Sequence, residues 1–207
     1  MACLLHDVGH SPFSHTGEKY YTNGIDFKDA LATQINSDQF TSDIKVTGIG
    51  NPHEAMSALV GLNLCNAFEL NIDNELFVRS IIGAKYSLET DENIFINAII
   101  GILNGDLIDV DKLDYLFRDA FVTGYSTITI DYERLLAGYT VCKTEDNKWC
   151  AAYERGALSV IEDVFYANDL ERRWIQNHPV VLYDNSIVDY AIRYYNEYYL
   201  GILKMQA

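Results

Sequence analysis

The chain has 207 residues and a formal net charge of −15, and 49% of its residues are hydrophobic while 22% are charged. This composition is typical of a globular protein with one sizeable core, so we expect a single domain over residues 1–207. The lack of an apolar run of about 18 residues excludes a membrane-spanning helix, the missing signal-peptide pattern indicates a cytoplasmic protein, and the negative charge argues against a nucleic-acid-binding surface.

Three of the five histidines in the chain lie close to its beginning, at His6, His10 and His15. Residues 2–5 are apolar and predict the last buried turn of a helix, which Gly9 and Pro12 end by opening a loop. We therefore expect His6 and Asp7 at a helix end, where an imidazole nitrogen and a carboxylate oxygen can converge on one cation.

The pair His6 and Asp7 offers the mixed nitrogen and oxygen ligands that suit Mn, Fe, Co, Ni or Zn rather than calcium. His10 and His15 would then stand just beyond the metal. The alternative interpretation is a set of unrelated polar residues in a loop, or a buried histidine that bonds to the backbone.

Two stretches of the chain carry no candidate site residues and are expected to form supporting structure. Residues 16–50 contain several glycines and one short amphipathic segment, 27–35, which predicts a loop, a short helix and a second loop. Helices are also expected over 74–84 and 92–104. The second of these is nearly all apolar, so we expect it to be central.

A further helix start is predicted between these stretches. Asn51 is a suitable N-cap and Pro52 suits the first helical position, so we expect a helix over 53–68. His53 and Glu54 lie in its first turn. The helix dipole also favours a carboxylate there, so Glu54 has an alternative role as a capping residue.

A cluster of charged residues follows. Asp109 is a natural cap, and 111–122 predict a helix that Gly124 ends. Residues spaced by four, seven and eight positions share a helix face, which brings together Asp111, Tyr115, Arg118 and Asp119. Lys112 borders this face.

Asp109 and Asp111 point in opposite directions on such a helix, so only one of them can be a metal ligand, and the shared face favours Asp111. The alternative is a salt-bridged face in contact with solvent. We prefer a pocket because Leu113, Leu116 and Phe117 are expected to form a buried opposite side.

The rest of the chain predicts a β-like segment over 125–130, a short helix from Asp131 to Ala137 and then a hairpin of 139–143 and 148–153. Cys142 and Cys150 can face each other across this hairpin and are expected to be free thiols. Long helices are predicted over 156–176 and 180–203, and the tyrosines of the last helix suit core packing or a subunit interface.

Three ordered motifs carry a resemblance to a known family. They are His6-Asp7 with its continuation to His15, the pair His53-Glu54, and the segment 109–119. Together they resemble the HD-superfamily phosphohydrolases, and within them the branch that contains the deoxynucleoside triphosphate triphosphohydrolases. The resemblance implies an all-α HD-domain fold with a small β-hairpin, in which 1–124 form the metal-site core and 125–207 pack on it.

The proposed metal site consists of a divalent transition metal (Mn, Fe, Co, Ni or Zn, or else Mg) held by His6, Asp7 and Asp111. Such a metal lowers the pKa of bound water and draws charge from a phosphoryl oxygen, which points to phosphate-ester hydrolysis. By resemblance, the catalytic groups around the α-phosphate are His10, His15 and His53. Lys112 and Tyr115 match phosphate-contacting positions, and Asp119 matches the carboxylate that holds the sugar 3′-hydroxyl.

The resemblance implies hydrolysis of a dNTP such as dGTP to deoxynucleoside and triphosphate by a homo-oligomer. The family's first metal-ligand histidine, on an upstream helix, is not among these 207 residues. Asn168, Gln176 and Pro179 stand where the family has an arginine, a tyrosine and a basic residue, so neither the base nor discrimination against ribose is predicted. Two alternatives remain: a phosphatase for nucleoside monophosphates or other small phosphoesters, and an incomplete HD-domain chain with a binding or regulatory role.

Overall fold

The computed structural model describes residues 1–105, 108–125, 129–146 and 149–200. The α-helices described are α1 (Ala2–Leu5), α2 (Ser14–Tyr21), α3 (Phe27–Ile35), α4 (Asp38–Thr47), α5 (Pro52–Ala67), α6 (Asn74–Ile82), α7 (Asp91–Leu103), α8 (Val110–Thr123), α9 (Tyr132–Gly138), α10 (Leu158–Glu171) and α11 (Pro179–Tyr195). Two strands, β1 (Tyr139–Lys143) and β2 (Trp149–Tyr153), form an antiparallel hairpin. The predicted all-α fold with a small hairpin is therefore confirmed.

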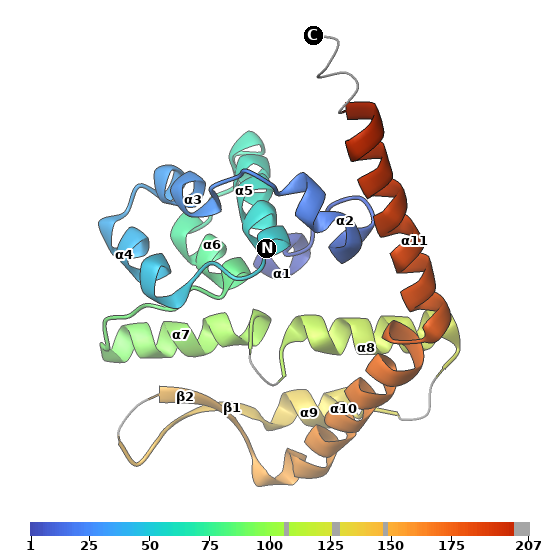
Figure 1. The fold of residues 1–207 in the computed structure, drawn as a ribbon. Coiled ribbons are helices and arrows are strands. Elements are labelled where there is room, and N and C mark those ends of the chain that lie inside the picture. The colour runs from blue at the N-terminus through green and yellow to red at the C-terminus, as the bar shows by residue number, and fades with distance from the viewer. Residues whose placement is uncertain (106–107, 126–128, 147–148, 201–207) are drawn as a thin grey trace.

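The helices lie in layers (Figure 1). Helices α1 to α6 form one layer, α7 and α8 follow one another below it, and the hairpin lies with α9 and α10 on the far side of α7 and α8. Helix α11 runs along the side of the molecule, next to α2. This arrangement places the beginning of α8 beneath the helices that carry the N-terminal motif.

Two hydrophobic clusters stabilise the layers. The larger cluster is buried among α3, α4, α5 and α6, and includes Leu31, Phe40, Leu62 and Ile81. The smaller cluster joins α8, α9 and α10, and includes Leu116, Leu135, Val160 and Val164. Helix α8 thus carries site residues at its beginning and packs against the smaller cluster further along.

A buried ion pair lies in the larger cluster. Arg79 and Asp43 are both fully buried, and Arg79 Nη2 donates to Asp43 Oδ2 at 2.8 Å. Asp43 also accepts from Ser87 Oγ at 2.5 Å and from Gln39 Nε2 at 2.8 Å. Burial raises the pKa of Asp43, but the hydrogen bonds from Ser87, Arg79 and Gln39 outweigh it and leave that pKa below its ordinary value. The guanidinium lies 3.7 Å from the centre of the Tyr86 ring.

Residues 16–50 contain more helix than the sequence pattern indicates, because α2 and α4 were expected to be loop. Helix α4 is capped by Ser37, whose Oγ accepts from Phe40 N at 3.2 Å. Helix α2 contains Gly17, and glycine in a helical pattern argues against a helix. The glycine is required by packing, since a Cβ at Gly17 would lie 2.0 Å from the carbonyl oxygen of Pro12.

Two expectations of burial are wrong. The apolar turn over residues 2–5 is expected to be buried, but α1 has no buried residue and Leu4 is 78% exposed. Phe117 on α8 is 62% exposed, since only Leu116 of the expected apolar side is buried. The apolar stripe of each helix is therefore wider than its packed face.

The C-terminal half differs from expectation in detail. Residues 126–128 of the predicted β-like segment lie outside the described residues, and residues 129 and 130 form no strand. The predicted helix over 156–176 divides into a 3-10 turn (Arg155–Ala157), α10 and a π-helical turn (Arg172–Gln176). Helix α11 ends in a second π-helical turn (Asn196–Leu200), and residues 201–203 are not described.

All four cysteines are free thiols, and Cys142 and Cys150 face each other with their Sγ atoms 3.8 Å apart.

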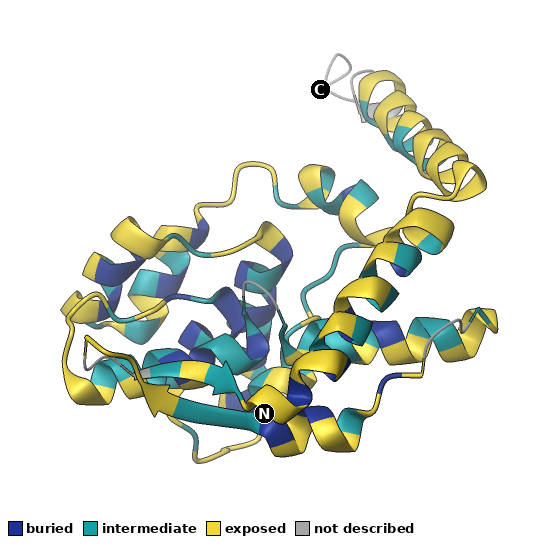
Figure 2. Cartoon of the chain, turned by 90° about the horizontal axis from the view of Figure 1, so that it is seen from below, coloured by how far each residue is buried: buried dark blue, intermediate teal, exposed yellow. Residues whose placement is uncertain are grey.

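Helix α11 is held loosely. None of its residues is buried, as its exposed colouring shows in Figure 2. It presents a row of tyrosines, in which the rings of Tyr194 and Tyr198 stack at 4.6 Å. In the described ranges, no helix combines the length and the apolar composition needed to cross a bilayer.

We expect Arg79→Ala to lower the free energy of unfolding by about 3–5 kcal/mol, because the carboxylate of Asp43 would remain buried without its cation. Urea unfolding followed by circular dichroism measures this change. Arg173→Ala is the control, since Arg173 pairs with Asp169 on the surface and should cost about 1 kcal/mol or less. Equal losses in the two variants would contradict the role of the buried pair.

The lowered pKa of Asp43 predicts that the free energy of unfolding depends on pH in acid. Its pKa is lower in the folded state, so its contribution is fully present above the unfolded value of about 3.9 and is lost as the pH falls through the folded value. The free energy of unfolding should therefore fall below about pH 4 in the native protein and fall less in Asp43→Asn. Urea unfolding at a series of pH values tests this difference, and parallel curves for the two proteins would count against it.

Candidate functional site

The loop after α1 is fixed against α5 by a close backbone contact. The amide of Gly9 donates to Ser57 Oγ at 2.8 Å. A Cβ at Gly9 would lie 2.2 Å from the backbone nitrogen of Ser57, so only glycine fits. This contact brings the residues on either side of Gly9 next to the beginning of α5, where His53 lies.

Three side chains with atoms suitable for binding a metal ion lie together where α1, the loop and α8 meet. His6 Nε2 lies 3.1 Å from Asp111 Oδ1 and 3.6 Å from Asp7 Oδ2. One ligand atom from each of the three lies within 4.8 Å of the others. The expected helix end places His6 and Asp7 here, and the Asp109 cap begins α8 so that Asp111 faces them, because Asp109 accepts from the amide of Lys112 at 2.7 Å.

The environment of His6 fits a cation. Its Nδ1 lies 2.9 Å from the carbonyl oxygen of Cys3, which can hold the proton on Nδ1 and leave the Nε2 lone pair facing two carboxylates. Burial lowers the pKa of His6, but the Cys3 carbonyl and the carboxylates of Asp111 and Asp7 raise it overall. The carboxylates of Asp7 and Asp111 repel each other, and a proton or a metal ion between them offsets this repulsion. The residues present therefore fit a divalent transition metal.

A small polar hollow adjoins these ligands. Its volume is about 60 Å³, and Glu54, Asn104 and Asp109 line it together with the ligand residues. Pockets that enclose a whole ligand measure about 300–1,000 Å³, so this hollow is small for an entire nucleotide. Glu54 also accepts from the amide of Asn51 at 2.5 Å, which bears out its alternative role as a cap.

The three other predicted histidines form a cluster beside this hollow. The rings of His10 and His53 stack with their centroids 4.3 Å apart and their planes 14° apart. His15 meets both rings edge-on at 5.0 Å. The nitrogens of this cluster are also close enough for a metal, but an ion lies in the plane of each imidazole that binds it, and two stacked planes share no such point. The cluster as it stands suits proton transfer better.

Glu18 orders the histidine cluster, and the sequence reasoning missed it. Glu18 Oε2 lies 3.3 Å from Nδ1 of His15 and 3.3 Å from Nδ1 of His53, and Oε1 accepts from the His53 amide at 3.0 Å. Burial raises the pKa of Glu18, but hydrogen bonds from His15 and His53 lower it overall, so the carboxylate stays ionised. The spacing of His15 and Glu18 is a signal only on a helix, and the sequence pattern predicts a loop from residue 16 to residue 26, where α2 continues to Tyr21.

Asp7 connects the two groups. Its Oδ2 faces His6, while its Oδ1 lies 3.4 Å from Nε2 of His10. Burial and the neighbouring His53 lower the pKa of His10, against an opposing effect of Asp7, so His10 is held neutral near pH 7. The carboxylate thus lies between the metal ligands and the proton-transfer groups.

The predicted substrate residues lie along α8 beyond Asp111. Lys112 is half-buried in the first turn. Tyr115 donates to Asn168 Oδ1 at 2.8 Å, and burial with the charges of Asp109 and Asp111 raises the pKa of Tyr115 to about 12. Asp119 accepts from Arg118 Nε at 3.3 Å. Tyr115 therefore ties α8 to α10, and the substrate roles of Lys112, Tyr115 and Asp119 stay predictions.

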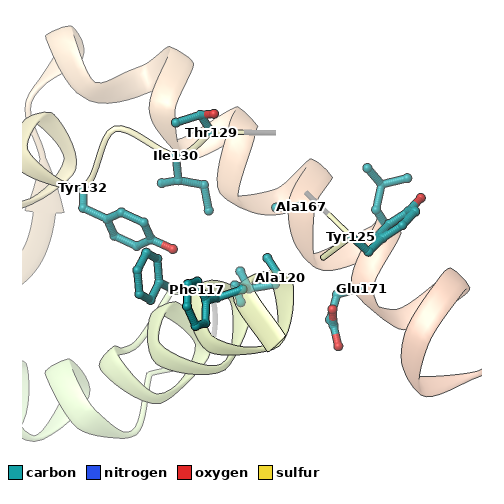
Figure 3. Close-up of a pocket in the computed structure, with 11 residues that line it drawn as sticks. Phe117, Ala120, Tyr125, Thr129, Ile130, Tyr132, Ala167 and Glu171 are labelled. Atoms are coloured by element: carbon teal, nitrogen blue, oxygen red, sulfur yellow. The ribbon is translucent and has the colours of Figure 1, made fainter. Parts of the chain in front are cut away.

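An apolar cavity of about 310 Å³ lies on another face of α8 (Figure 3). Phe117 and Tyr132 line one end, and Tyr125 and Glu171 line the other. Glu171 is 5% exposed, and burial together with the Asp119 carboxyl raises its pKa. The described lining includes none of the residues predicted for the site, so this cavity is separate from the metal ligands.

Comparisons with known proteins agree with the motifs. The chain is 31% identical over 79% of its length to the uncharacterized protein MG461 of Mycoplasma genitalium. It is 33% identical over 66% of its length to a deoxynucleoside triphosphate triphosphohydrolase SAMHD1 homolog of Dictyostelium discoideum. It is 33% identical over 87% of its length to a putative HD domain-containing protein, L394, of Acanthamoeba polyphaga mimivirus.

These relatives are much longer than the matched region. The chain covers 33% of the Mycoplasma protein, 22% of the Dictyostelium protein and 34% of the mimivirus protein. No protein-family model matches the chain. The similarities support the HD superfamily as the setting for the groups described above.

The geometry predicts that Asp111→Asn weakens metal binding by at least about tenfold, because a direct carboxylate ligand is lost. The metal content of desalted protein, measured by elemental mass spectrometry, should be about one Mn, Fe, Co, Ni or Zn per native chain. Asp114→Asn on the same helix is the control, because Asp114 is exposed and pairs with Arg118. Equal metal content in both variants would argue against Asp111 as a ligand.

Proposed function

We propose that this chain is a metal-dependent phosphohydrolase of the HD superfamily that hydrolyses a deoxynucleoside triphosphate to deoxynucleoside and triphosphate. The observation that carries the proposal is the adjacency of two groups: the ligand set His6, Asp7 and Asp111, and the histidine cluster, which contact each other through Asp7. Phosphate-ester hydrolysis needs a cation for the phosphoryl oxygens and an acid for the leaving oxygen, and these groups supply both.

The three ligand residues would hold a divalent transition metal. When bound, such an ion lowers the pKa of a coordinated water and draws charge from a phosphoryl oxygen. His6 presents Nε2 for this purpose because the Cys3 carbonyl holds its Nδ1. The small hollow admits part of a phosphate at most, so the sugar and the base of a nucleotide lie outside it.

His15 is the proposed proton donor to the leaving oxygen. Its side chain is 71% exposed while that of His53 is 10% exposed, so His15 is the cluster member that a substrate reaches most easily. Glu18 holds Nδ1 of His15 and leaves Nε2 for the substrate. His53 packs against both other rings and keeps them in place.

The nucleotide as substrate is supported by the motifs and by the named activity of two of the relatives, the SAMHD1 proteins of Dictyostelium discoideum and Danio rerio. In the proposed complex, Lys112 and Tyr115 contact the phosphates, while Asp119 holds the sugar 3′-hydroxyl. A small monophosphate is the second candidate, because the hollow at the ligand residues is itself small. Homo-oligomerisation stays a prediction.

The test is product analysis with the purified chain, Mn²⁺ and dGTP. We expect deoxyguanosine and intact triphosphate, and we expect His15→Ala to lower kcat by about 10²- to 10⁴-fold, as for loss of a general acid. His178→Asn is the control, because His178 lies outside the cluster and its Nδ1 accepts from the amide of Val180 as an N-cap, which Asn can also do.

Two results would contradict this proposal. Stepwise release of inorganic phosphate from dGTP would exclude the triphosphohydrolase reaction. Hydrolysis of deoxynucleoside monophosphates with no reaction of dGTP would favour the phosphatase alternative.

A further inference from the structure

Helix α11 packs on helix α2 incompletely. An open hollow of about 410 Å³ lies between them and is lined by apolar side chains that include Tyr21 from α2 and Val188 and Ile192 from α11. None of the residues of α11 is buried. Apolar packing therefore holds α11 to α2 weakly, and polar contacts across the gap matter more than usual.

Asp189 makes such contacts. Its Oδ1 lies 2.6 Å from Lys19 Nζ and accepts from the hydroxyl of Tyr20 at 2.8 Å. These hydrogen bonds from Lys19 and Tyr20 lower the pKa of Asp189, and the hydrogen bond to Asp189 raises the pKa of Lys19. One carboxylate on α11 thus binds two consecutive residues of α2.

The residue before this pair is Glu18, which orders the histidine cluster. Helix α2 has only eight residues, and φ is positive both at its N-cap, Phe13 (65°), and at its first residue, Ser14 (51°). Such a short helix has little stability of its own, so its position depends on the contacts that its faces make. One face bonds to His53 through Glu18, and another bonds to α11 through Asp189.

We propose that Asp189 is a positioning residue for the histidine cluster. By holding Lys19 and Tyr20 it fixes α2, and through α2 it sets where Glu18 and His15 lie relative to His53. This role rests on the proposed hydrolase function for its catalytic consequence, although the effect on α2 does not depend on it. A contact that moves α11 would act on the cluster by the same route.

The first test compares Asp189→Ala with Asp184→Ala, which removes an exposed carboxylate from the same helix. We expect Asp189→Ala to lower kcat for dGTP by roughly tenfold to a hundredfold, because displaced catalytic groups react more slowly. KM and metal content should stay unchanged, since the ligand residues are not on α2. Asp184→Ala should behave as the native protein.

The charge-reversed pair Lys19→Asp with Asp189→Lys provides the rescue. It restores an ion pair between the same two positions, so kcat should recover relative to either single variant. A loss confined to KM, or a double variant as slow as the single ones, would overturn the proposal. Asp189→Asn, which keeps an acceptor for Tyr20, should retain more activity than Asp189→Ala.

Hydrogen exchange separates this proposal from the proposed function. The backbone amides of α2 should exchange faster in Asp189→Ala than in the native protein, and the charge-reversed pair should restore their protection. This measurement needs no substrate, so it remains decisive if dGTP is not hydrolysed. Unchanged exchange of α2 in Asp189→Ala would overturn the role of Asp189, whatever the activity.

Discussion

The site depends on the approach of one glycine to a helix backbone. Gly9 lies so close to Ser57 that no side chain fits between the loop and α5. The loop therefore presents His6 and Asp7 to α8 on one side of the contact and His10 to His53 on the other. Asp111 and His53, which are far apart along the chain, thereby become parts of two neighbouring groups, and Asp7 lies between these groups.

Electrostatics then decide what the site can hold. The chain is strongly acidic, and the ligand set adds two carboxylates beside one imidazole. Positive charge at the centre of this set lowers the repulsion between the two carboxylates, and a proton supplies part of that charge while a divalent ion supplies more. The histidine cluster has the opposite arrangement, since Glu18 is one carboxylate shared by two rings. One group is thus suited to a cation and the other to moving protons.

The parts of the structure that depend on local chemistry could be predicted from the sequence. The caps at Asp109 and Gly124, and Pro52 at the start of α5, gave helix ends close to those observed. Helix α2 could not be predicted, because Gly17 is tolerated there only through its contact with Pro12, and Glu18 was missed with it. The exposure of Phe117 and the hydrogen bond from Tyr115 to Asn168 likewise depend on the position of α10. A local sequence pattern does not predict that position.

The π-helical turn at Arg172–Gln176 affects how positions are matched between relatives. A π turn holds one more residue than the α turn that it replaces, so the side chains before and after it are rotated by about 100° relative to a continuous helix. Asn168 lies before this turn and Pro179 lies after it. An equivalence assigned across the turn by sequence spacing therefore holds in space only for a relative with the same π turn, and superposed backbones identify which side chain of α10 stands where such a relative has its arginine.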